Sequence, residues 1–278
     1  NRDDLLLTVK ETPGELEEYD RKGAPPNTLK TLMALVGYEG DFCAIVKQIG
    51  LKRVRKFPKA ADGMIALLSD RKAQPQERFS AAYALGDLRC RKAIPALTEA
   101  LRDADYNVRG FSALALGKMG DPACHEALLP MATNLREGDD LRCLVLLSLA
   151  NAQFPKAREA LLQVARKDPS MPSRRAALMA LGVKASPQER KLLVEFCEDR
   201  DALIRAAAVM GLGFSGQPRE TLLKHAGKKE SDATVRGYAA LALGITGSPE
   251  VAPDLIAILQ KDPNIEVRGC AALALSRV

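Results

Sequence analysis

The sequence has few aromatic residues and no tryptophan. Phe and Tyr make up 4% of its 278 residues, so the apolar side chains are mainly those of Ala, Leu, Val and Ile. Small aliphatic side chains suit close packing of helices better than a large sheet, since strands favour β-branched and aromatic residues. With 47% hydrophobic and 27% charged residues, the composition is that of an ordered soluble protein or repeat protein, which excludes disorder and collagen.

The chain also lacks the residue groupings of several kinds of site. No apolar run approaches the roughly 18 residues that span a bilayer. Six cysteines lie far apart without a C-x-x-C pair, which predicts reduced, mostly buried thiols and a cytoplasmic location. With only two histidines, we expect no metal site and no cofactor. A signal or anchor removed upstream of Asn1 would leave no trace in this sequence.

Charge is distributed unevenly near the N-terminus. Residues 1–20 carry seven acids against two bases, whereas residues 21–59 carry nine bases against two acids. The most basic segment, residues 47–59, has six bases and one aromatic residue, too few aromatics for a single-strand nucleic-acid binder. We interpret it as a solvated loop, with docking to an acidic protein surface and binding to nucleic acid or anionic lipid as alternatives. Its basic patch consists of Lys52, Arg53, Arg55 and Lys56.

A repeat of 31 to 33 residues organises most of the chain. An Arg recurs seven times, and each is followed seven residues later by a Leu with a small residue before it and Gly, Ala or Ser after it. A fixed period of this length is typical of stacked repeats. The arginines are Arg78, Arg109, Arg142, Arg174, Arg205, Arg236 and Arg268. The leucines are Leu85, Leu116, Leu149, Leu181, Leu212, Leu243 and Leu275.

Each repeat is predicted to be a pair of helices, an Arg helix followed by a second helix. Side chains able to cap a helix stand four residues before the Arg in five repeats; they are Asp105, Ser170, Asp201, Asp232 and Asn264. The Gly after the Leu is predicted to end the Arg helix with a positive φ. Prolines then open the second helix; they are Pro122, Pro155, Pro187, Pro218 and Pro249.

The pattern D-x-x-[VI]-R, followed by small residues and A-L-G or G-L-G, occurs at residues 105–117, 201–213 and 232–244. It resembles the HEAT-repeat family, and the short period is similar to the HEAT-like repeats named after phycobilisome lyases. The resemblance covers residues 78–278. It implies an all-α fold, an α-solenoid in which antiparallel helix pairs stack into a right-handed superhelix. A single hairpin cannot bury both its faces, so stacking is obligatory.

We predict two regions, an N-terminal extension or cap over residues 1–40 and a HEAT-like solenoid over residues 41–278. The solenoid begins with a degenerate repeat at 41–73, whose second helix falls near residues 59–70, and continues with clear repeats at 74–278. The last repeat stops after its Arg helix. An unpaired helix would expose an apolar face, so we expect the natural chain to continue past Val278 or another molecule to cover this end.

The Arg series is the most conspicuous polar feature. We interpret it as a structural ladder of pairs between each Arg and an Asp of the preceding turn or the neighbouring repeat, with a ligand-binding row as the alternative. Cys124 and His125 are adjacent, but neighbours on a helix do not face each other, so we expect His125 on the helix surface and no catalysis. Cys143 and Cys270 are predicted to be buried thiols.

The predicted function is that of a non-enzymatic scaffold or adaptor, because no catalytic constellation is present. The resemblance implies that second helices line a concave surface that binds a partner protein. A long polar surface suits a protein or peptide better than a small molecule, since no deep apolar pocket is implied. One alternative is a bilin-lyase-like subunit acting on a chromophore-bearing protein; another, disfavoured by the missing tryptophan, is a HEAT-like nucleic-acid-binding protein. The candidate partner-binding residues are Glu99, Arg102, Asn134, Arg136, Gln163, Arg166, Lys191, Glu195, Lys224 and Lys228.

Overall fold

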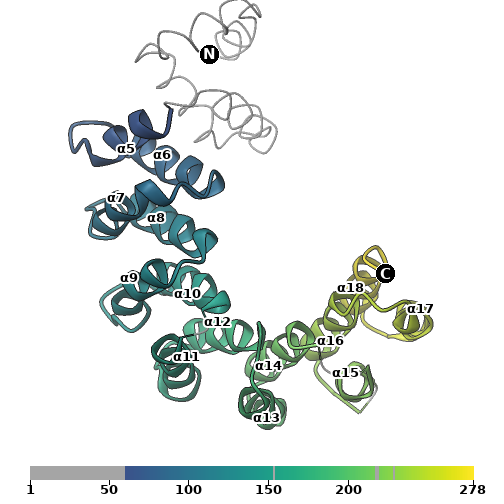
Figure 1. The fold of residues 1–278 in the computed structure, drawn as a ribbon. Coiled ribbons are helices and arrows are strands. Elements are labelled where there is room, and N and C mark those ends of the chain that lie inside the picture. The colour runs from purple at the N-terminus through teal and green to yellow at the C-terminus, as the bar shows by residue number, and fades with distance from the viewer. Residues whose placement is uncertain (1–59, 153, 217–218, 228) are drawn as a thin grey trace, which may run out of the picture. The chain divides into compact units, whose positions relative to one another are not determined.

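The computed structural model describes residues 60–152, 154–216, 219–227 and 229–278. These residues form helices and turns with no strand, so the predicted all-α solenoid class is confirmed (Figure 1). The Arg helices are α6 (Pro75–Asp87), α8 (Tyr106–Met119), α10 (Asp139–Ser148), α12 (Met171–Gly182), α14 (Ala202–Phe214), α16 (Ala233–Ile245) and α18 (Ile265–Leu275). The second helices are α5 (Ala60–Ser69), α7 (Ile94–Ala100), α9 (Pro122–Ala132), α11 (Pro155–Lys167), α13 (Pro187–Phe196), α15 (Arg219–Ala226) and α17 (Ala252–Lys261).

The chain divides into two compact units, unit 1 up to Cys124 and unit 2 from His125 onward. In unit 1, α6 packs against α8, and α5 and α7 pack against α6 and α8 respectively. In unit 2, each Arg helix packs against the next, and α11, α13, α15 and α17 each cover one Arg helix. The predicted boundary at residue 40, the basic patch and most of the degenerate repeat lie outside the described residues.

Helix starts follow the predicted capping residues. At all five predicted positions the side chain accepts a hydrogen bond from a backbone N–H of the first turn; these N-caps are Asp105, Ser170, Asp201, Asp232 and Asn264. Pro122, Pro155 and Pro187 are the first residues of their helices, and Pro249 opens a 3₁₀ turn (Pro249–Val251) that leads into α17. Pro218 lies outside the described residues. The local sequence therefore sets the helix boundaries.

The glycines that follow the leucines have a different role from the predicted one. They lie inside their helices or at the last residue, and among the described residues the positive φ angles belong to Gly120, Gly216 and Gly247 and to Arg89 and Lys184. A Cβ on Gly182 would lie 2.1 Å from the carbonyl oxygen of Gly211, and one on Gly244 would lie 2.7 Å from Ala274. These glycines are therefore needed because the next Arg helix approaches too closely for any side chain.

The Gly contacts explain why small residues stand on both sides of each Leu. The Gly after one Leu faces the small residue before the Leu of the next repeat. The pairs are Gly86 with Ala115, Gly182 with Gly211, Gly213 with Ala242, and Gly244 with Ala274. Two rows of the repeat thus form one interface between adjacent Arg helices, a close approach that only small side chains permit.

The repeat leucines form the core of the stack. Leu116, Leu181 and Leu243 have no exposed surface, and Leu85, Leu149 and Leu212 are equally buried. Leu275, in the last repeat, is half-buried. Each layer from α6 to α16 thus contributes one fully buried repeat Leu to the apolar interior of its unit.

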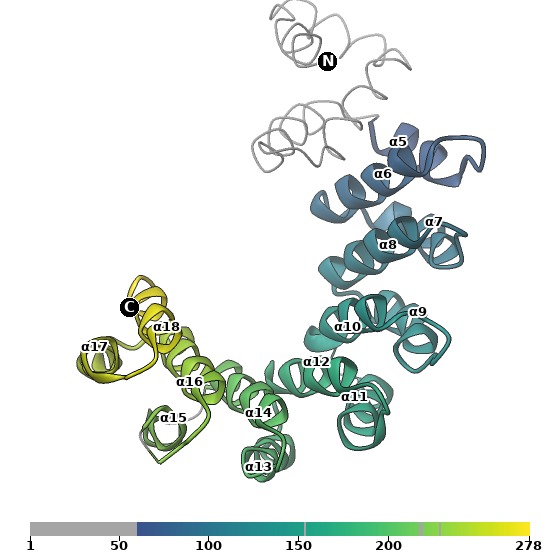
Figure 2. The ribbon, with the colours of Figure 1, turned by 180° about the vertical axis from the view of Figure 1, so that it is seen from behind.

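In unit 2 the Arg helices lie on the inner side of the curve and the second helices on the outer side (Figures 1 and 2). The inner helices are α10, α12, α14, α16 and α18, and the outer ones include α11, α13, α15 and α17. Consecutive Arg helices are in extensive contact, whereas among the described residues of unit 2 no two second helices are. The closely packed layer takes the shorter path, which is why it is on the inside. This corrects the prediction that second helices line the concave surface.

Candidate functional site on the inner face of unit 2

The Arg series forms ion pairs that join one repeat to the next. Asp103 accepts from Arg78 at 2.9 Å, and Arg205 and Arg236 each make two hydrogen bonds, to Glu230 (3.2 and 2.9 Å) and Asp262 (2.8 and 3.1 Å) respectively. Arg142 likewise pairs through two nitrogens with Asp168. Each acid stands two residues before the N-cap of the following Arg helix, where it also accepts a backbone N–H. The acid therefore belongs to the neighbouring repeat.

Four of the arginines also bind the loop that precedes their own helix. Nη1 of Arg236, for example, donates to the carbonyl oxygens of Glu230 and Ser231 at 3.1 and 3.0 Å. Arg109, Arg205 and Arg268 contact the equivalent two carbonyls. One loop is thus held by its own Arg at the carbonyls and by the preceding Arg at the acid, which gives the series a structural role.

Arg174 departs from this pattern. Its Nε donates to the Ala165 carbonyl at 3.1 Å, and no carboxylate binds it among the described residues. At this level Arg158 of α11 supplies the link instead, because it pairs with Glu189 of α13 at 2.6 Å and donates to the Leu181 carbonyl at 2.8 Å. Burial opposes ionisation of Glu189, but hydrogen bonds from Arg158 and Ser186 lower the pKa of its carboxyl.

The predicted partner-binding residues on second helices do not form one charged surface. In unit 1, Glu99 lies 3.7 Å from Arg71 and 3.9 Å from Arg102. In unit 2, Asn134 and Arg136 lie in the loop after α9, and Lys224 pairs with Glu198 at 2.6 Å. Exposed second-helix residues of unit 2 point away from the inner face; they are Gln163, Arg166, Lys191 and Glu195. Lys228 lies outside the described residues.

Three of the five Arg helices of unit 2 are without charge on their inner side, whereas α10 carries Asp140 and α18 carries Glu266 at the corresponding position. On α12, α14 and α16 the residues two before and two, five and nine after the repeat Arg follow helical spacing and share one face. None of these twelve residues is charged, and they define the inner apolar face: Pro172, Ala176, Met179, Val183, Leu203, Ala207, Met210, Phe214, Thr234, Tyr238, Leu241 and Ile245. Leu203 and Phe214 are 41% and 40% exposed, at opposite ends of α14.

This face is turned to solvent because the other sides of each Arg helix are covered. The two neighbouring Arg helices cover its flanks and a second helix covers its outer side. On α14 the central Ala207 and Met210 are buried, and the exposed Leu203 and Phe214 lie on either side of them along the helix. Exposed apolar side chains on one side of a protein are typical of interaction sites, and methionines adapt to different partners.

A family model for HEAT repeats matches residues 61–150, 126–213, 158–232 and 191–276. The chain belongs to the HEAT-repeat family. The resemblance inferred from the repeat motif is therefore confirmed. No curated protein matches this HEAT-repeat chain in sequence.

Several solved structures are similar to this HEAT-repeat protein. One is the complex of CpcE and CpcF of phycocyanin lyase from Nostoc sp. PCC7120, with 21% identity, a TM-score of 0.49, and coverage of 92% of this chain and 97% of that one. Human deoxyhypusine hydroxylase is 20% identical, with a TM-score of 0.36 and coverage of 91% and 96%. Kap95p, solved with RanGDP, is 14% identical, with a TM-score of 0.48 and coverage of 92% and 40%.

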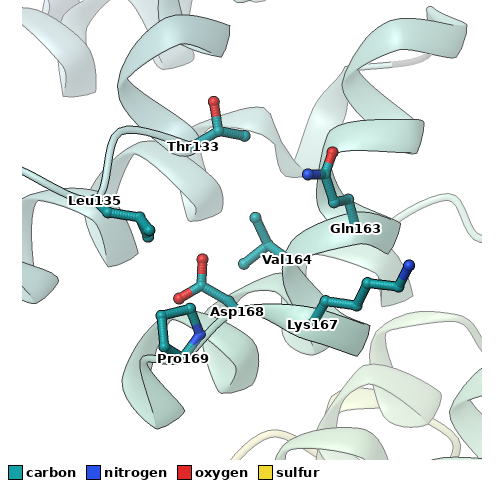
Figure 3. Close-up of a pocket in the computed structure, with 7 residues that line it drawn as sticks. All are labelled: Thr133, Leu135, Gln163, Val164, Lys167, Asp168 and Pro169. Atoms are coloured by element: carbon teal, nitrogen blue, oxygen red, sulfur yellow. The ribbon is translucent and has the colours of Figure 1, made fainter.

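Two pockets of the HEAT-repeat protein lie at loops that lead into Arg helices. The first has a volume of about 150 Å³ and is lined by Thr133, Leu135, Gln163, Val164, Lys167, Asp168 and Pro169 (Figure 3). The second, about 320 Å³, is lined by Cys197, Glu198, Asp199, Arg205, Lys224, His225, Lys229, Glu230 and Ser231. The carboxylates of Asp168, Glu198 and Glu230 already form ion pairs with Arg or Lys side chains of the same chain. We therefore interpret both pockets as gaps beside these ion pairs rather than as ligand sites.

The cysteines and histidines have the properties of packing residues. Burial raises the pKa of the Cys197 thiol to about 12 and also raises that of Cys124, so both stay protonated near neutral pH. His125 is buried rather than on the helix surface, and its ring lies 6.1 Å from that of Phe154, because α9 turns this side chain toward the α11 layer. Burial lowers the pKa of His225.

The prediction that the cysteines are mostly buried holds for only some of them. Cys143 and Cys270 are half-buried and so less buried than predicted, because their Arg helices expose one side to solvent; Cys90, in the turn after α6, is also half-buried. The described part of the HEAT-repeat chain has no group of three His, Cys, Asp or Glu placed to hold a metal ion. None of its described helices is both long and apolar enough to cross a membrane.

Sequence reasoning missed the inner apolar face, and it predicted acids of the preceding turn or the neighbouring repeat as partners of the Arg series without identifying them. The acids had a signal, since an Asp or Glu stands two residues before the N-cap in several repeats, as in Asp103, Asp168, Asp199, Glu230 and Asp262. The face had a weaker signal. Its residues follow helical spacing, but the same spacing describes the buried side of the helix, and only the packing shows which side meets solvent.

Proposed function

We propose that this HEAT-repeat protein is a non-enzymatic scaffold that binds a partner protein through the inner apolar face of unit 2. The observation that supports this is the absence of any charged residue among the twelve that define the face on α12, α14 and α16. A surface three helices wide suits a protein partner better than a small molecule, which prefers an enclosed pocket.

The polar residues of unit 2 support binding rather than catalysis. The ladder arginines are held by carboxylates and backbone carbonyls, as with Arg236 and Asp262, so they are engaged in joining repeats. The buried Cys197 thiol is protonated at neutral pH and is a poor nucleophile. An apolar face also fits a protein better than nucleic acid, which needs many cations to neutralise phosphates. The bilin-lyase-like alternative stays a prediction.

Site-specific photo-crosslinking in the full chain tests the proposal. A photoreactive phenylalanine analogue replaces Leu203 or Phe214 on the inner face, and the matched controls carry it at the exposed Lys191 or Glu195 on α13. We expect a defined protein crosslink from the two inner positions and none from the outer ones. Crosslinks from the outer positions alone would overturn the proposal.

An activity assay separates the alternatives. Co-expression with a bilin and an acceptor protein, read by visible absorbance, should give no chromophore attachment if the chain acts only as a scaffold. Attachment that is lost on substitution of one polar residue would show an enzyme instead. In both assays, thermal unfolding of each variant establishes that the fold is intact.

A further inference from the structure

Arg175 of α12 has no hydrogen-bond or ion-pair partner among the residues that the structure describes. It follows the ladder residue Arg174 on α12 and is half-buried. Its Nε is buried and meets no acceptor in the described part of the chain. Arg78 and Arg142 also leave Nε unpaired, but their Nη atoms bind Asp103 and Asp168.

The repeat register places Arg175 next to the centre of the face. In a later repeat the equivalent residue is Gly237, and a Cβ built there would lie 3.2 Å from Sγ of Cys270, two residues after the Arg of the next Arg helix. The same register sets Arg175 against Ala207 on α14. Ala207 is 1% exposed and belongs to the inner apolar face, so the register leads us to expect the Arg175 side chain at the edge of that face.

A guanidinium in this setting favours a carboxylate from outside the chain. A charged group that is partly withdrawn from water without a hydrogen-bond partner is costly, and a carboxylate offers the strongest, two-pronged acceptor. None of the twelve residues of the inner apolar face is acidic. The inner apolar face therefore offers no carboxylate of its own to Arg175 at its edge.

Resting on the proposed function, we propose that Arg175 binds an Asp or Glu side chain that the partner protein presents among apolar residues. The occupant is an amphipathic helical segment with an apolar side for Leu203, Met210 and Phe214 and one acid opposite Arg175. Charge complementarity selects this occupant: a purely apolar segment leaves Arg175 unpaired, and a basic one repels it. Arg175 is thus the specificity-determining residue of the face.

A displayed library of amphipathic helical peptides tests this proposal. The apolar positions are fixed, the others are randomised, and selection uses the full chain, either wild type or Arg175→Glu. We expect wild type to enrich an acid at one position and Arg175→Glu to enrich Lys or Arg there. Changing that acid to its amide, or Arg175 to Gln, should weaken binding about tenfold or more, as for a hydrogen bond between charged groups.

The controls separate this inference from the proposed function. Arg166→Gln removes the same charge from the exposed side of α11 and should leave peptide binding unchanged. If Phe214→Asp abolishes peptide binding while Arg175→Gln does not change it, the inference about Arg175 is wrong and the inner face remains the binding site. If no peptide is selected, or if Phe214→Asp and Leu203→Asp have no effect, both proposals are wrong.

Discussion

The Arg helices and the second helices of unit 2 have similar lengths but different surroundings. Arg helices pack against one another through glycine and alanine. They supply the arginines of the ladder, and three of them expose an apolar side. Second helices contact mainly their own Arg helix and expose mostly charged or polar residues, with Val194 and Ile256 as exceptions. The difference teaches that the layer with the closest backbone contacts determines both the curvature and the available binding surface.

The same comparison changes where a partner is expected. Charged residues on the second helices led to the predicted partner-binding surface, yet some of them are paired, as Lys224 is with Glu198. The twelve residues of the inner apolar face include no charge, and Leu203 and Phe214 among them are exposed. Binding surfaces of solenoids are thus better located from packing than from charge.

Loss of a ladder acid should have the largest effect on stability. Arg142 and Asp168 have side chains only 2% and 6% exposed, and removing one partner of a buried pair costs about 3–5 kcal/mol because the other charge is left uncompensated. Glu198→Ala breaks the outer pair with Lys224, which is about two-thirds exposed, and should cost less than about 1 kcal/mol. Urea unfolding of Asp168→Ala and Glu198→Ala measures both. Equal losses would remove the distinction between the layers.

Adding one methyl group between Arg helices should have the next largest effect. In Gly182→Ala the new Cβ meets the backbone of Gly211 at 2.1–2.6 Å, and overpacking of this kind costs about 1–3 kcal/mol. The matched control is Gly269→Ala on α18, where a Cβ meets nothing within 4 Å; it should gain about 0.5–1 kcal/mol from helix propensity. Thermal unfolding separates them, and a neutral Gly182→Ala would contradict the proposed close approach.

The ladder should also make unit 2 sensitive to acid. Hydrogen bonds from Arg236 lower the pKa of Asp262 against the opposing effect of burial. Its contribution is therefore present above the unfolded pKa, about 4, and is lost as pH falls through the lower folded pKa. Asp262→Asn should flatten the decline of unfolding free energy below about pH 5.

The outer pair provides the control for this pH effect. The hydrogen bond from Lys224 also lowers the pKa of Glu198, so Glu198→Gln acts in the same direction. Because that pair is exposed, its effect should vanish in high salt, while that of Asp262→Asn persists. Unfolding curves between pH 2 and 7 at two salt concentrations measure this. A salt-sensitive Asp262 effect would show that the ladder behaves as a surface feature.

Substitution of an outward charge should have the smallest effect. Lys191 on α13 is exposed and has no ion-pair partner among the described residues, so Lys191→Ala should change the unfolding free energy by less than about 0.5 kcal/mol. It should also leave crosslinking from Phe214 unchanged. A loss of that crosslink would mean that the partner reaches both layers.

The sequence was sufficient to predict much of the fold but little of the candidate site. Capping residues such as Asp201 act through hydrogen bonds within one turn, so their role could be predicted locally. Gly182 was assigned to the wrong role, because a glycine near a helix end fits a cap and a close contact equally well. The inner apolar face was missed, because helical spacing does not tell which neighbour covers a given side.

By itself, the sequence determined the helical repeat, its period, its helix starts and the buried leucines. These depend on short-range hydrogen bonding and on apolar spacing, both of which are written into each 31- to 33-residue unit. Only the tertiary structure decided which layer lies inside the curve, which acid each Arg binds and which apolar side chains reach solvent. Those outcomes depend on distances between repeats, and the small residues that allow Arg helices to touch have that effect only once the repeats are stacked.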